Sequence, residues 1–173
     1  MIVSRVRIVA RVTSGIVACI TLTGLGIGLG MAPAHGGDGD GLTRQEFTER
    51  ATKQCENLLD ASNELRKAQA PGAAGKRVAK FLHRAADGLG KLVDGFDALN
   101  PPPKLEADTD ELVDVLAGYA DGLDTLADRV RRGQTFRVAL EKNGNLVARL
   151  NGIAERATGL VTRLGLTGCL LPT

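Results

Sequence analysis

The chain has 173 residues, with 22 Lys and Arg, 20 Asp and Glu and a formal net charge of +2. It is long enough to form one domain with a buried core. Four Phe, one Tyr and no Trp leave Leu, Val and Ala to fill that core, and this composition favours helices over a β-sandwich or a β-barrel.

The N-terminal segment has the pattern of an export signal. Three arginines precede an uncharged, apolar stretch over 12–34, which ends in Ala32-Pro33-Ala34, a small-x-small sequence that signal peptidase can cut. We expect 1–34 to be a cleaved signal peptide. The alternative is an uncleaved membrane anchor, because the stretch is long enough to span a bilayer. Either reading places the rest of the chain outside the cytoplasm, and cleavage leaves one more acidic than basic residue.

Residues 35–42, rich in Gly and Asp, are predicted to be a flexible linker. A twelve-residue loop from Asp38 to Glu49 has acidic residues at the first, third and twelfth positions of a calcium-binding EF-hand. Leu42 and Thr43 occupy its fifth and sixth positions, where an oxygen ligand and a Gly are needed. We therefore do not expect a calcium site.

Two helices are predicted in the first half of the remaining chain. Thr43 and Glu46 have the spacing of a capping box, so the first helix begins there and ends at about residue 70, before Pro71-Gly72. The second covers about 76–99 and ends before three prolines. The side chains that recur every three or four positions and should face the core are Phe47, Ala51, Cys55, Leu58, Ser62, Leu65, Val78, Leu82, Ala85, Leu89, Leu92, Phe96 and Leu99.

Two further helices follow in the second half. The third is expected to begin near Asp108 and to end before Gly133. The fourth covers about 135–164, with a kink at Asn143-Gly144-Asn145, where the apolar stripe is interrupted. The stripe residues are Leu112, Leu116, Tyr119, Leu123, Leu126, Val130, Phe136, Leu140, Val147, Leu150, Ala154, Ala157 and Val161.

Four helices joined by short connections predict an all-α domain over 43–173, an up-down-up-down four-helix bundle. In that topology the start of the first helix and the end of the fourth lie at the same end, so a tail after Leu164 can reach Cys55. We expect Cys55 and Cys169 to form one structural disulfide in an oxidising compartment, at the acidic end of the bundle. The alternative is two buried free thiols.

Three short motifs accompany this pattern: Cys55 in the first helix, Asn100-Pro101-Pro102 in mid-chain and Leu164-Gly165-Leu166-Thr167-Gly168-Cys169 near the C-terminus. In this arrangement the chain resembles a loose group of small exported or membrane-tethered helical proteins of high-GC Gram-positive bacteria. The resemblance spans the chain after the export signal. It implies an extracytoplasmic location and a helical fold, and it implies no activity.

Reactive constellations are not apparent in the sequence. His83 follows Leu82 and precedes Arg84 with no second metal-ligating residue nearby, so it is interpreted as a solvated side chain. The acidic residues of 106–111 lie where a helix begins, and the helix dipole favours acids there, so no cation site is expected. We expect no enzymatic activity and no cofactor.

Charge is segregated along the chain. Residues 66–84 hold six basic residues and no acidic one, whereas 85–125 hold ten acidic and two basic residues. In the predicted topology the basic residues gather at the end away from the N-terminus, and helix dipoles explain only part of this asymmetry. The candidate contact surface consists of Arg66, Lys67, Lys76, Arg77, Lys80, Arg84, Arg129, Arg131, Arg132 and Arg137, with Lys142 at the same end.

These observations predict a non-enzymatic extracytoplasmic module of the cell envelope, with structural or interaction roles. Its basic end would contact an anionic envelope polymer, lipid headgroups or an acidic protein, with nucleic acid not expected. The alternative is a carrier of a small apolar ligand in the core. Six glycines inside the helices could leave internal space for it: Gly88, Gly90, Gly95, Gly118, Gly122 and Gly152.

Overall fold

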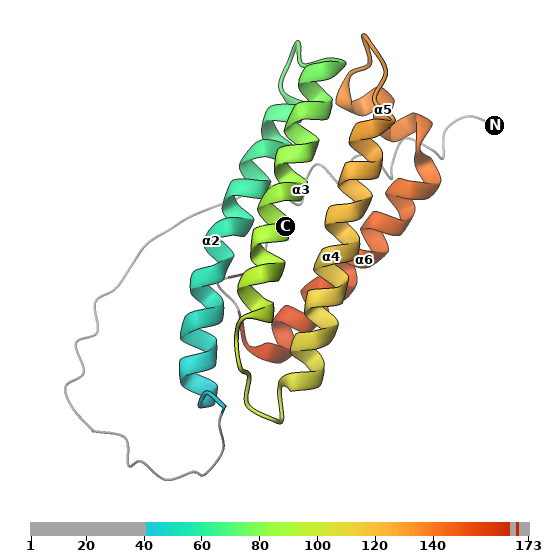
Figure 1. Cartoon of the computed structure of the whole chain (residues 1–173). Coiled ribbons are helices and arrows are strands. Elements are labelled where there is room, and N and C mark those ends of the chain that lie inside the picture. Colours follow the sequence, from blue (N-terminus) through green and yellow to red (C-terminus); the bar gives the residue numbers. More distant parts are fainter. Residues whose placement is uncertain (1–40, 167–168, 170–173) are drawn as a thin grey trace, which may run out of the picture. The chain divides into compact units, whose positions relative to one another are not determined.

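A computed structural model describes residues 41–166 and 169 (Figure 1). Within these residues the secondary structure is entirely helical, which confirms the predicted all-α class. All of the described helices lie in one compact unit, Leu42–Leu170. The predicted export segment (1–34) and most of the predicted linker (35–42) lie outside the described residues. The helices are α2 (Arg44–Gln69), α3 (Lys76–Asp97), α4 (Glu106–Asp128), α5 (Phe136–Lys142) and α6 (Gly144–Leu164).

The start of α2 is fixed by the predicted capping box. The backbone N–H of Glu46 donates to the hydroxyl of Thr43 at 3.3 Å, and the backbone N–H of Thr43 donates to the Glu46 carboxylate at 2.9 Å. Two amides that the helix itself cannot satisfy thereby gain acceptors. The backbone N–H of Leu42 donates to the carbonyl of Asn100 at 3.0 Å, which ties the entry to α2 to the residues just after α3.

The core of α3 follows its predicted stripe from Val78 to Phe96, all of it buried. In α2 the stripe holds through Phe47, Ala51 and Cys55 and then shifts. Leu58 and Leu65 are half-buried, whereas Ala61 and Ala68 are buried. The reason is the close approach of α3: a Cβ added at Gly88 would lie 3.1 Å from the Cβ of Ala61, so only small side chains fit between the two helices.

Helix α4 begins two residues before the predicted position. Its first turn is preceded by a tight turn in which the Leu105 N–H donates to the Pro102 carbonyl at 2.8 Å. Thr109 is buried, and its hydroxyl donates to the carbonyl of Leu105 at 2.8 Å, which satisfies its polar group inside the core. The prolines therefore end α3 and also shape the entry to α4.

The predicted fourth helix is broken into α5 and α6 at Asn143, as the interrupted stripe indicated. Asn143 has φ −116° and ψ 37°, outside the helical range. Its side-chain amide donates to the carbonyl of Ala139 at 2.8 Å, and its backbone carbonyl accepts from Val147 N–H at 3.0 Å. The Asn143 side chain thus donates to a backbone carbonyl at the end of α5, and the chain bends at this residue.

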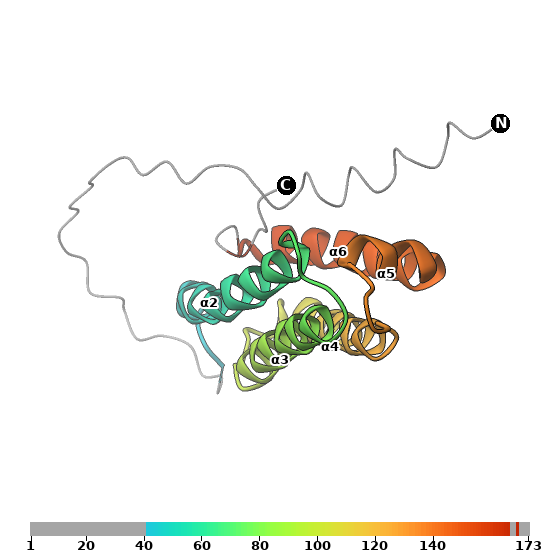
Figure 2. The ribbon, with the colours of Figure 1, turned by 90° about the horizontal axis from the view of Figure 1, so that it is seen from above.

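The helices pack in two layers, as Figure 2 shows from above: α2 and the α5–α6 pair form one, and α3 and α4 form the other. Helix α3 packs along α2 and along α4, and α4 packs along α6. The residues after α6 extend the core, because Leu166 and Cys169 are both buried. The core therefore includes side chains beyond the last helix.

Glycines at helix contacts serve close packing at three of the six predicted positions. Gly88 faces Ala61, Gly95 faces the side chain of Gln54, and Gly122 faces Leu150. In each case the neighbouring residue occupies the space that a Cβ on the glycine would need. Gly90 and Gly152 face open space, and at Gly118 an added Cβ would lie 3.9 Å from Ile153.

Candidate functional site

The connection between α2 and α3 and the connection between α4 and α5 meet at one end of the bundle (Figure 1). The backbone N–H of Gly75 donates to the carbonyl of Gln134 at 2.7 Å. A Cβ added at Gly75 would lie 3.0 Å from the backbone nitrogen of Gly133, so the two connections touch through their main chains. We call this region, residues 66–84 and 129–142, the basic end. Its two halves are far apart in sequence and are held together by backbone contacts.

A hollow of about 570 Å³ opens at the basic end, and we call it the basic hollow. Its side chains come from the end of α4, the following loop and the end of α5. They carry three cations against one carboxylate. The lining residues are Asp128, Arg129, Arg131, Gln134, Lys142 and Asn143.

The helix break places one of the arginines at this hollow. The Arg129 guanidinium donates from Nη1 to Oδ1 of Asn143 at 3.4 Å, while Nδ2 of Asn143 donates to the carbonyl of Ala139. The bond to Ala139 orients the Asn143 amide so that its Oδ1 faces the Arg129 guanidinium beside the end of α5. The kink that the sequence predicted is therefore also a support for the site.

Gln134 is the buried polar residue of the hollow, with 8% of its surface exposed. Its Oε1 accepts from the backbone N–H of Arg131 at 3.0 Å. Only the amide oxygen can accept from an N–H, so this bond fixes the orientation of the side-chain amide. Nε2 then has no hydrogen-bond partner among the described residues. Sequence reasoning missed Gln134, because a single Gln in a loop carries no pattern.

The ten predicted contact residues divide into two groups. Lys67 and Arg84 pair with Glu64, and Arg137 pairs with Glu141. The other seven have no carboxylate partner among residues 41–166 and 169, although Arg66 donates to Asn63 and Arg77 to the carbonyl of Gly72. Arg129 and Arg131 are brought together at the basic hollow with Lys142. The seven are Arg66, Lys76, Arg77, Lys80, Arg129, Arg131 and Arg132.

A second hollow, of about 400 Å³, lies along α2 and α3 and has mixed charge. Glu64 lies in it between Lys67 and Arg84, with the Arg84 Nη1 3.8 Å from Oε2 of Glu64. That carboxylate oxygen is buried and has no hydrogen bond within the described residues. The Arg84 side chain is half-exposed, so this is a surface ion pair at the edge of a groove.

Two acids at the opposite end of the bundle, Asp108 and Glu111, pair with arginines of α6. Arg156 Nε donates to Glu111 at 2.6 Å, and Arg163 donates to Asp108 at 3.0 Å. The hydrogen bond that Arg163 donates to Asp108, opposed by partial desolvation, raises the pKa of Arg163 above its ordinary value. The interpretation of 106–111 through the helix dipole alone was therefore incomplete, because pairing across helices cannot be read from local sequence.

The side chain of His83 is 45% exposed, in keeping with the prediction of a solvated residue, but its contacts with two carboxylates were not predicted. Its Nδ1 lies 2.8 Å from Asp124 and its Nε2 lies 3.6 Å from Asp128, one turn further along α4. The carboxylates are 41 and 45 positions away in sequence, so only the packing of α3 on α4 reveals them. No group of three potential metal ligands is close enough to hold an ion within the described part of the chain.

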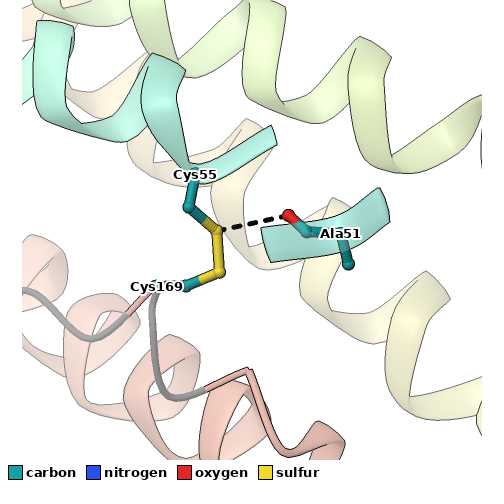
Figure 3. Close-up of a disulfide and its surroundings, with 3 residues drawn as sticks. All are labelled: Ala51, Cys55 and Cys169. Carbon is teal, nitrogen blue, oxygen red and sulfur yellow. Dashed lines mark hydrogen bonds between the residues drawn. A yellow bond between two sulfur atoms is a disulfide. The ribbon is translucent and has the colours of Figure 1, made fainter. Parts of the chain in front are cut away.

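Cys55 and Cys169 lie side by side at disulfide distance, with their Cα atoms 5.2 Å apart (Figure 3). Both are buried, and Sγ of Cys55 lies 3.4 Å from the carbonyl oxygen of Ala51. Cys55 is about three turns inside α2, so the pair lies toward the middle of that helix and not at its first turn. Cys169 therefore lies further along α2 than expected.

Comparisons of the chain with protein-family models, with curated proteins and with solved structures found no match. None of the described helices combines the length and the apolar character that crossing a membrane requires. What the basic end can bind is therefore inferred from the positions and charges of its own residues.

Proposed function

We propose that the protein is a non-enzymatic extracytoplasmic module of the cell envelope that contacts an anionic partner through its basic end. The observation that carries this proposal is the uncompensated charge there. Seven basic residues lack a carboxylate partner in the described structure, and two of them line the basic hollow with Lys142. Exposed, unpaired cations attract anions over several ångströms and speed association.

The contrast between the two ends of the bundle supports the proposal. At the end where α4 begins, two acids, Asp108 and Glu111, are paired with Arg163 and Arg156 of α6. At the basic end the corresponding compensation is missing around Arg131 and Arg132. Surface ion pairs contribute little to stability, so unpaired cations cost the fold little and remain available for binding.

The scaffold of this module is proposed to be an up-down-up-down four-helix bundle closed by one disulfide. In this reading α5 and α6 are one helix bent at Asn143. The Cα separation of 5.2 Å for Cys55 and Cys169 lies within the range of native disulfides, and both residues are buried. A disulfide agrees with an oxidising, extracytoplasmic compartment, which the apolar N-terminal segment and its arginines also favour.

The alternative function, a carrier of a small apolar ligand, receives less support from the packing. Ala61, Gln54 and Leu150 occupy the space beside Gly88, Gly95 and Gly122, which therefore bring helices together.

Retention of the full chain on isolated cell envelopes tests the proposal. Three arginines of the basic end, Arg129, Arg131 and Arg132, are replaced by Glu. A matched control replaces Arg50, Lys53 and Lys104, which are exposed and lie outside the basic end.

Both triple variants change the net charge equally. Loss of retention in the basic-end variant alone supports the proposal. Equal retention of the wild type and the basic-end variant, with unchanged circular dichroism, contradicts it.

A further inference from the structure

We propose that the basic hollow binds a phosphorylated sugar or polyol. This assignment rests on the proposed function, because it names the chemistry of the anionic partner. It is carried by three features of the hollow: its cations, its size and its neutral hydrogen-bonding groups.

The cations suit a phosphate group. Arg129 and Arg131 offer guanidinium groups, which bind phosphate with two parallel hydrogen bonds, and Lys142 adds a point charge. Within the described residues none of the three has a carboxylate partner. Asp128, the acidic residue of the hollow, has its Oδ1 3.6 Å from Nε2 of His83 on α3. The hollow is therefore cationic overall.

Arg129 has a hydrogen-bond partner at the hollow that orients its guanidinium. Its Nη1 donates to Asn143 Oδ1 at 3.4 Å, and Asn143 is itself fixed by its bond to Ala139. A guanidinium that is already oriented loses less conformational freedom when phosphate binds. Asn143 is thus a positioning residue for the site.

The size of the hollow indicates a ligand larger than one phosphate ion. Its volume of about 570 Å³ lies within the range of small-molecule sites, roughly 300–1,000 Å³. None of its lining side chains is aromatic or aliphatic, so stacking of a nucleobase and burial of an apolar chain are both disfavoured. A polyhydroxylated group attached to the phosphate fits this polar lining.

Gln134 supplies the group that would recognise a hydroxyl. It is more than nine-tenths buried, and its Oε1 is occupied by the Arg131 N–H. Nε2 remains a donor without a partner in the described structure. Nε2 is not among the buried atoms that lack a partner in the described residues, so it is open to solvent and can donate to a hydroxyl oxygen of the ligand. The Asp128 carboxylate can accept a hydrogen bond from a hydroxyl of the same ligand.

Calorimetric titration of the full chain with glucose 6-phosphate, inorganic phosphate and glucose tests the assignment. We expect saturable binding of glucose 6-phosphate with a Kd of about 1 mM or lower, weaker binding of phosphate and none of glucose. The double variant Arg131→Met, Lys142→Met should weaken glucose 6-phosphate binding at least about tenfold. Lys104→Met, a control in the α3–α4 connection, should stay within about twofold of the wild type.

Gln134→Met separates the sugar contact from the charge. It should reduce the preference for glucose 6-phosphate over phosphate while leaving phosphate binding unchanged. If this variant unfolds, the double variant of two exposed side chains still decides the question. No saturable binding of glucose 6-phosphate up to about 10 mM, or an equal loss in Lys104→Met, overturns the assignment.

The same proteins distinguish this assignment from the proposed function. Retention on envelopes that depends on the basic end, combined with no binding of glucose 6-phosphate, refutes the sugar-phosphate site alone. If retention does not depend on the basic end and glucose 6-phosphate does not bind, the proposed function is refuted as well. If the sugar phosphate binds, its ability to release the protein from delipidated envelopes identifies a polymer unit as the source. Binding without such release identifies a free sugar phosphate.

Discussion

Replacing Gly75 by Ala should destabilise the protein more than any ordinary surface substitution, because Gly75 joins the two halves of the basic end. Its φ is +54° and its ψ is −124°, a conformation that L residues adopt at a cost of about 1–3 kcal/mol. The added Cβ would also lie 3.0 Å from the nitrogen of Gly133 and 3.4 Å from Cα of Arg132. These are backbone atoms that cannot rotate away, so the Gly75–Gln134 hydrogen bond must lengthen.

Losing much of that hydrogen bond costs about 1 kcal/mol more, so we expect a total loss of about 2–4 kcal/mol. Gly72→Ala is the matched control: Gly72 has φ +77° but nothing within 4 Å of an added Cβ, so only strain of about 1 kcal/mol is expected. Urea unfolding followed by circular dichroism measures both free energies. If Gly75→Ala costs no more than Gly72→Ala, the contact between the two connections is not as described.

Three further predictions concern the core and the cysteines. Gly122→Ala should lower the free energy of unfolding in urea by about 1–3 kcal/mol, because the side chain of Leu150 must move. Gly90→Ala, where an added Cβ meets nothing, should raise it by about 0.5–1 kcal/mol. Equal effects of the two substitutions would indicate free space beside Gly122 and favour the carrier. Cys169→Ser should lower the free energy of unfolding by about 2–5 kcal/mol without reductant, and an unchanged value contradicts the disulfide. Burial raises the pKa of Tyr119, the one Tyr of the chain. The unfolded chain loses that proton first, so stability should fall as pH rises above about 10, and an absorbance titration midpoint at or below 10 refutes this.

Local patterns predicted the helices well where local forces decide them. The capping box at Thr43, the apolar stripe of α3 and the interruption at Asn143 all depend on residues within a few positions of one another. The shift in the core of α2 could not be predicted this way. Ala61 is buried because Gly88, on another helix, allows a close approach, and that pairing is a property of the packed structure.

In the candidate site, too, local sequence predicts some features and packing between distant residues decides the others. The sequence predicted a basic end, because clusters of Lys and Arg are visible as runs and the order of the helices gathers them. It did not predict which arginines are neutralised. Glu64 pairs with Lys67 three positions along α2, and it also pairs with Arg84 on α3, a contact between helices that local sequence does not reveal. Gln134 becomes important only because it is buried beside Arg131, and burial of a single polar residue has no sequence pattern.

The salt dependence of envelope binding tests the central claim most directly. Cations that contact a polyanion displace counterions, so the logarithm of the binding constant falls as the logarithm of salt concentration rises. We predict a negative slope for the wild type that becomes shallower when Arg129, Arg131 and Arg132 are replaced by Glu, and stays unchanged for the matched variant of Arg50, Lys53 and Lys104. Identical slopes for the two variants would contradict a partner bound at the basic end.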